Sequence, residues 1–278
     1  LNMAQQPLQP STIPTQQQLD NLPTIIARPL HKLLNAENPL EIIDAAEMVT
    51  DFTLRFLGLV CMSQYLADLG WNDKELTNYF DEKLQRPALG IWIQLISTSL
   101  KSAEKNNKEL FLKELNDTWT RCETLKPVSY EDQQRDDFGK QITKLKNFGR
   151  LETLVFLRNA INHNRLKRSP EVAAKYKKYV FDALHEYKWL SSYEIKHTDS
   201  DGVWWCKGLA PILESNQSQS QSRTFIKKTN RILELLPLVV SHGRIVGRGN
   251  SVSLETELYS EIALYNGWSN DEILYNGY

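Results

Sequence analysis

Cysteine is scarce in this chain, and the few cysteines form no pattern. The 278 residues include three of them, Cys61, Cys122 and Cys206, with neither a CxxC spacing nor a Cys/His pairing. An odd number of scattered thiols favours neither a disulfide framework nor a zinc site. We therefore expect a protein of a reducing compartment, the cytoplasm, that needs no metal ion.

The chain also lacks a long uncharged apolar run and an excess of charge of either sign. Its formal net charge is −1, so only a local patch of basic side chains could attract an anionic partner. The longest apolar segment, 42–69, contains Asp44, Glu47, Asp51, Arg55 and Asp68. Charges at that density exclude a membrane span. The first residues also lack the basic-then-apolar layout of a secretion signal.

Sequence signatures of nucleotide and metal chemistry are missing as well. No GxxxxGK[ST], HExxH or GxSxG pattern occurs. The closely spaced glycines at 243–251 lack the third glycine of a dinucleotide loop, so we predict a turn there. Asp199 and Asp201 match only part of a calcium loop, because the later ligands are absent. Four histidines have no partner constellation, and we expect them at the surface or as helix caps: His31, His185, His197 and His242.

What the chain does contain divides it into three parts. Residues 1–21 are rich in Gln and Pro and have little to bury, so we expect a mobile or loosely docked arm. Residues 22–190 show helical periodicity, and residues 191–278 contain short β-branched or aromatic segments. The predicted fold class is therefore α+β, an antiparallel helical bundle followed by a small antiparallel β region.

Capping residues and apolar stripes define the helices. Asn38-Pro39 is a typical N-cap and first-turn pair, and Ser169-Pro170 repeats the pattern. We expect the segment 150–163 to pack against the long helix 39–69, because its apolar residues are too many for an exposed helix. The predicted helices are 23–35, 39–69, 72–85, 88–104, 107–123, 138–148, 150–163 and 170–187, with a polar connection at 126–137.

The β region is defined by short segments between turn residues. The predicted strands lie within 189–197, 202–209, 231–240, 243–248 and 258–265, and a polar loop is expected at 214–223. Asn-Gly, the strongest hairpin-turn dipeptide, occurs at 266–267 and again at 276–277. Only Tyr278 follows the second copy. We therefore expect the chain to be the front part of a longer protein.

One stretch, FLRNAINHN at 156–164, places four polar side chains in an apolar helical pattern. Asn159 and His163 are four residues apart and share one helix face, whereas Arg158 and Asn162 share another. Arg158 and His163 lie about 140° apart around the helix axis. They converge only if the arginine side chain wraps round the helix or the helix loosens near its end.

These residue types suit phosphodiester chemistry. A histidine can take the proton of a 2′-hydroxyl near neutral pH, and an arginine can hold the phosphate through two hydrogen bonds. No metal ion is needed for such a reaction. The catalytic candidates are Arg158, Asn159 and His163, with Asn159 orienting the imidazole. The candidates for RNA contact, mostly from the basic run that follows, are Asn162, Arg165, Lys167 and Arg168.

The order Arg, polar residue, three further positions and His, found here at 158–163 late in a helical domain, resembles the motif of the HEPN superfamily. The resemblance covers 22–190 and implies an antiparallel bundle that forms a homodimer through its motif helices. Many active members are metal-independent ribonucleases of toxins, antiphage defence and RNA processing. The resemblance therefore implies RNA as substrate, with Arg158 and His163 as the catalytic pair. The β region is not part of the basic HEPN bundle.

A second interpretation stays open. Similar segments occur in HEPN-like bundles without nuclease activity, where Arg and Asn bond to a neighbouring helix and His caps the helix. Buried polar groups must be paired in either case. The chain would then be an interaction, dimerisation or sensor module for a C-terminal effector domain outside it. A nuclease should expose Arg158 and His163 in one groove, whereas a scaffold should bury them in hydrogen bonds.

Overall fold

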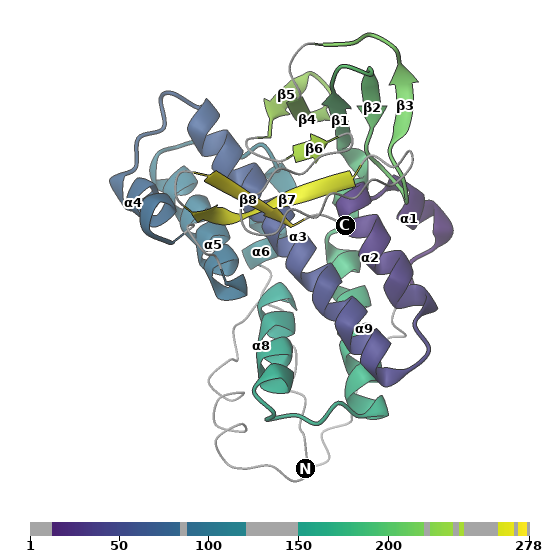
Figure 1. The fold of residues 1–278 in the computed structure, drawn as a ribbon. Helices are drawn as coiled ribbons and strands as arrows, with labels where there is room; N and C mark the ends of the chain where they lie inside the picture. The colour runs from purple at the N-terminus through teal and green to yellow at the C-terminus, as the bar shows by residue number, and fades with distance from the viewer. Residues whose placement is uncertain are drawn as a thin grey trace.

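The computed structural model describes residues 13–83, 88–120, 150–219, 223–235, 239–241, 261–269 and 272–276, and only the backbone of the last three segments. Within these ranges helices precede strands, which confirms the predicted α+β class (Figure 1). The helix expected at 138–148, the connection at 126–137, the strand and turn expected within 243–251, and His242 lie outside the described residues.

Except for the first, which was not predicted as a helix, the described helices follow the predicted order, with shorter bounds in several places. They are α1 (Gln16–Asn21), α2 (Thr24–Asn35), α3 (Pro39–Ala67), α4 (Lys74–Lys83), α5 (Leu89–Lys105), α6 (Lys113–Thr120), α8 (Arg150–Asn162) and α9 (Pro170–Glu186), followed by the 3₁₀ helix η1 (Lys188–Ser192). Ser169 caps α9 by accepting a hydrogen bond from the Val172 N–H, with Pro170 in the first turn, as predicted.

The long helix α3 is the axis of the bundle, and α2, α5, α8 and α9 pack around it (Figure 1). Its start is fixed by Asn38, whose Oδ1 accepts a hydrogen bond from the Glu41 N–H at 2.9 Å, with Pro39 in the first turn. At Gly58 an added Cβ would lie 2.6 Å from the Trp92 ring, so α5 can approach only because no side chain is present. No helix in the described part of the chain is long and apolar enough to cross a membrane.

Part of the expected N-terminal arm is helical in the structure. Thr15 caps α1: its hydroxyl accepts from the Gln18 N–H at 3.2 Å, and its own N–H donates to Gln18 Oε1 at 2.8 Å. Leu19 is fully buried, and α1 packs against α2 and η1. Residues 16–21 of the expected arm therefore form a capped helix that is docked through one buried leucine.

The helix predicted at 107–123 is shorter at its start. Gln64 of α3 clamps the chain before α6: its Nε2 donates to Glu109 O at 2.8 Å, and its Oε1 accepts from the Phe111 N–H at 2.6 Å. Because these backbone groups bond to a side chain, residues 109–111 form a link, and α6 begins only at Lys113.

The β region forms antiparallel sheets, as predicted. β1 (Glu194–Thr198), β2 (Val203–Trp205), β3 (Ile212–Ser215), β4 (Arg223–Lys228) and β5 (Arg231–Glu234) make a five-stranded sheet of order β3-β2-β1-β4-β5. β6 (Val239–Ser241), β7 (Glu261–Ser269) and β8 (Glu272–Asn276) make a second sheet of order β6-β7-β8. Residues 189–192, expected in a strand, belong instead to η1. The first sheet lies at one end of the bundle (top in Figure 1), and its inner side chains join the helical core.

The first Asn-Gly dipeptide does not form the predicted turn. Asn266 and Gly267 lie inside β7, where the pairing with β8 shifts register between Tyr265 and Gly267. Glycine suits such a bulge because it tolerates unusual backbone angles. β7 instead ends at Ser269 and β8 begins at Glu272, so the reversal lies four residues further on than the turn signal at 266–267 placed it.

Candidate functional site at the end of α8

The motif lies on α8, which packs against α3 as predicted. The apolar residues of α8 are buried in this packing, which also involves α9 and α5: Leu151, Leu154, Val155, Leu157 and Ile161. Their burial fixes which way the polar residues face. Arg158 is half-buried beside α3, whereas Asn159, Asn162 and His163 are exposed.

Arg158 is held against α3 by an acidic residue. Its Nε lies 3.9 Å from Glu47 Oε2. With the Asn162 amide oriented so that both of its ends are paired, its nitrogen donates to Glu47 Oε1 at 3.2 Å and its oxygen accepts from Arg158 Nε at 3.1 Å. The three side chains therefore form a small network, here called the α3–α8 brace. The predicted pairing of Arg158 and Asn162 on one helix face is present, and its partner is Glu47.

Burial dominates the electrostatics of the brace. It raises the pKa of Glu47, and the nearby Arg158 charge and the Asn162 hydrogen bond oppose the rise only in part. The Arg158 side chain is 37% exposed and that of Glu47 21%. A solvent-facing ligand can thus reach the guanidinium, but only in competition with a carboxylate that is already there.

His163 follows the last residue of α8. Its N–H donates to Asn159 O at 3.0 Å, and the chain then reverses at Asn164, whose φ is 57°. Arg165 N–H closes the helix by donating to Ala160 O at 2.8 Å. The His163 ring is exposed, and among the described residues we find no side-chain partner for it. Asn159 Oδ1 accepts from Arg158 Nη1 at 3.2 Å instead of bonding to the imidazole.

The basic run beyond His163 is exposed but partly neutralised. Arg165, Lys167 and Arg168 are all exposed, and Arg168 Nη1 lies 3.4 Å from Asp44 Oδ1 of α3. Two of the arginines predicted to contact phosphate, Arg158 and Arg168, therefore face acidic residues of the neighbouring helix.

Glu47 is the residue of this site that the sequence analysis did not single out. The available signal was its position on α3, three residues after Asp44 and four before Asp51, which places three carboxylates on one stretch of helix surface. Three neighbouring carboxylates predict a basic side chain as their partner. They do not indicate which of the several basic segments of the chain supplies it.

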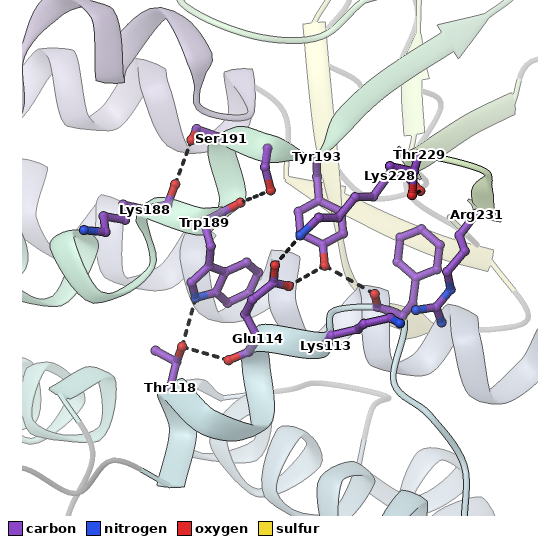
Figure 2. A network of polar contacts seen from close by, with 12 residues as sticks. Lys113, Glu114, Thr118, Lys188, Trp189, Ser191, Tyr193, Lys228, Thr229 and Arg231 are labelled. Carbon is purple, nitrogen blue, oxygen red and sulfur yellow. Dashed lines mark hydrogen bonds and ion pairs between the residues drawn. The ribbon is translucent and has the colours of Figure 1, made fainter.

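A second polar network, also missed, joins α6 to the five-stranded sheet (Figure 2). Glu114 accepts a hydrogen bond from the buried Tyr193 hydroxyl at 2.6 Å and one from Lys228 Nζ. Lys228 also lies 4.5 Å from the centre of the Tyr193 ring. Trp189 of η1 extends the contact by donating from Nε1 to Thr118 Oγ1 at 2.9 Å. We call the Glu114, Tyr193 and Lys228 contact the α6–sheet junction.

The expectation of a surface or capping role for His197 was wrong. Its side chain is 1% exposed, with Nδ1 3.0 Å from Thr224 Oγ1 and Nε2 3.5 Å from Asp199 Oδ2. Asp199 Oδ1 in turn accepts from the N–H groups of Asp201 and Gly202. The His-x-Asp segment thus organises the turn between β1 and β2, and its burial removes it from contact with any substrate.

Two further findings bear on the nature of the site. In the described part of the chain, no group of three or more His, Cys, Asp or Glu side chains could hold a metal ion. Comparison of the chain with protein-family models, with curated proteins and with solved structures found no match.

Proposed function

We propose that the chain is a HEPN-like interaction or sensor module of the cytoplasm, which forms a homodimer and passes a signal to an effector domain outside this chain. The observation that supports it best is the position of Arg158, shared between Glu47 and Asn162. A carboxylate lies beside the Nε of the guanidinium, so a phosphate would have to compete with it for Arg158. Displacing it would leave a partly buried carboxylate without its counter-charge.

The charge around the motif supports the same proposal. A nuclease needs a continuous basic track for the RNA backbone, but Asp44 and Glu47 oppose Arg168 and Arg158 along α3. The exposed end of α8 offers the polar groups of Asn159 and His163, whereas both ends of the Asn162 amide are paired within the brace. Such a surface suits hydrogen bonding to a second copy of the same helix end.

An RNA cleavage assay paired with a measurement of molecular mass tests this function. We expect wild-type protein to leave single-stranded RNA intact and to associate as a dimer in sedimentation equilibrium. The double variant Asn159→Glu/His163→Glu should weaken association by placing like charges opposite each other. Lys101→Glu, on the exposed surface of α5, is the matched control. RNA cleavage that vanishes in a folded His163→Ala variant would contradict the proposal.

A second candidate function, a metal-independent endoribonuclease of defence or stress response, is favoured by one specific contact. Arg158 Nη1 reaches Asn159 Oδ1 at 3.2 Å, so the guanidinium extends toward the face that carries the exposed His163. In this mechanism His163 takes the proton of a 2′-hydroxyl. The 2′-oxygen then attacks the adjacent phosphorus, and the 5′-oxygen of the next nucleotide leaves with the returned proton. Arg158 would hold the phosphate oxygens, with Arg165, Lys167 and Arg168 along the strand.

Mutations separate this candidate from the first. For a nuclease, His163→Ala should lower cleavage by about 10²–10⁴-fold without unfolding the protein. Arg158→Lys should restore little of what Arg158→Ala loses, because an ammonium lacks the planar fork. Glu47→Gln should increase cleavage by freeing the guanidinium, and chelators should have no effect. Absence of cleavage in both wild type and Glu47→Gln would exclude this candidate.

A further inference from the structure

A small open pocket lies where α1, α2, the end of α9 and η1 meet, away from the motif on α8. Its volume is about 200 Å³. The floor is apolar and consists of side chains that belong to the bundle core: Leu22, Leu30, Phe181 and Leu184. These four residues come from α2, α9 and the C-cap of α1, so the pocket is formed by the packing of the helices and not by a single loop.

The rim of the pocket is basic. His185 and Lys188, both exposed, stand three residues apart across the end of α9 and the start of η1. The remaining rim side chains are uncharged, and no Asp or Glu lines the pocket. Behind the rim, Lys207 Nζ donates to Ser191 O at 2.6 Å and adds a further positive charge. An apolar floor under a basic rim fits a ligand with an apolar body and an anionic head.

Size narrows the ligand class further. A pocket for a drug-sized molecule usually has a volume of about 300–1,000 Å³, which is larger than this one. A methylene group fills about the volume that one water molecule occupies in the liquid, about 30 Å³. A pocket smaller than that class admits only a short apolar chain of a few such groups, with the head group outside at the rim.

We propose that this pocket binds a medium-chain carboxylate, with the acyl chain on the leucine and phenylalanine floor and the carboxylate between His185 and Lys188. The ligand would touch α1 and η1 at once, and η1 leads directly into β1 of the sheet. Binding would then link the N-terminal helix to the α6–sheet junction. This inference goes beyond the proposed function and does not rest on it.

Titration calorimetry on the full chain, with octanoate as the probe, tests the proposal. We expect octanoate to bind, hexanoate to bind about tenfold more weakly because two methylenes are lost, and acetate not to bind. Octanamide, which has the same chain and no charge, should bind about two- to fivefold more weakly than octanoate. The backbone amide signals of Gln18, Leu184 and Lys188 should shift in NMR spectra as octanoate is added.

Variants at exposed positions make the test specific without endangering the fold. His185→Gln/Lys188→Gln should lower octanoate affinity about two- to fivefold, whereas Lys101→Gln on α5 should leave it unchanged. No octanoate binding at millimolar concentration would overturn the proposal. Equal affinity for octanoate and octanamide would overturn the anionic class. Unchanged affinity in the double variant, or amide shifts confined to other elements, would overturn the location.

Discussion

Glu47 and Glu114 each join two elements through a basic side chain and a polar neighbour, but their surroundings differ. At the α6–sheet junction, Glu114 uses both oxygens, one for Tyr193 and one for Lys228. Burial alone would raise its pKa, but the hydrogen bonds from Lys228 and Tyr193 outweigh that effect and lower it. At the α3–α8 brace the balance is opposite: burial raises the pKa of Glu47, and Arg158 compensates only in part.

The opposite pKa shifts of Glu114 and Glu47 indicate which of the two contacts stabilises the fold. A lowered carboxylate pKa means that the folded state favours the charged form, so the α6–sheet junction stabilises the fold at neutral pH. A raised pKa means that folding makes the charged form more costly. Glu47 therefore adds little stability to the α3–α8 brace and leaves Arg158 available for competition. A contact of this kind suits a site of interaction better than a structural joint.

The largest expected effect is at Tyr193, the fully buried aromatic of the α6–sheet junction. Tyr193→Ala should lower the free energy of unfolding by about 3–5 kcal/mol, because it removes a large buried side chain. Tyr193→Phe should cost about 1–2 kcal/mol, the value of the hydrogen bond to Glu114. Urea unfolding measures both. A loss below about 1 kcal/mol for Tyr193→Ala would show that the junction is not a structural joint.

Glu114→Gln should come next, with a loss of about 1–2 kcal/mol at pH 7. The folded-state pKa of Glu114 is lowered from 4.5, so its contribution is present above that pH and is lost as pH falls through the folded pKa. The difference between wild type and variant should therefore shrink below about pH 4.5. Urea unfolding at pH 7 and pH 4 checks this, and a difference that grows on acidification would contradict the assigned direction.

The sequence predicted the elements of the molecule better than its contacts. The caps at Asn38 and Ser169 act locally, so the starts of α3 and α9 could be read directly. The start of α6 could not be predicted from the local sequence, because it depends on Gln64, a residue of another helix. The Asn-Gly turn failed for a related reason: the pairing of β7 with β8 absorbs the dipeptide as a bulge and overrides the local preference.

In the candidate site, too, local features were predicted and contacts between distant segments were not. Helical spacing correctly placed Arg158 and Asn162 on one face, because that follows from the geometry of a single helix. Their partner Glu47 lies more than a hundred residues earlier in the chain, and only the packing of α8 on α3 brings it near. His197 was misjudged likewise, since its burial depends on Thr224 of a neighbouring strand.

A smaller effect is expected at Arg158. Arg158→Ala should lower the free energy of unfolding by about 1 kcal/mol, because the pair with Glu47 is partly exposed and screened by solvent. His163→Ala should change it by less than about 0.5 kcal/mol, since the ring is exposed. Thermal or urea unfolding of both variants measures this. A loss above about 3 kcal/mol for Arg158→Ala would place the brace beside the α6–sheet junction as a structural joint.

Among the four residues of the brace and the junction that these variants change, Glu47 should matter least at pH 7: Glu47→Gln should change the free energy of unfolding by less than about 1 kcal/mol in either direction. Its pH dependence is the informative part. Because the folded-state pKa of Glu47 is raised above 4.5, the folded protein binds more protons than the unfolded chain between these two values. The stability of the wild type therefore falls as pH rises through this window, whereas glutamine does not titrate. Relative to its glutamine variant, wild-type Glu47 should thus become less favourable for stability from pH 4 to pH 7, and wild-type Glu114 more favourable.

Urea unfolding of both variants at pH 4, 5.5 and 7 measures the two trends. If both trends had the same sign, the two glutamates would contribute to stability in the same way. That result would contradict the distinction between the α3–α8 brace and the α6–sheet junction.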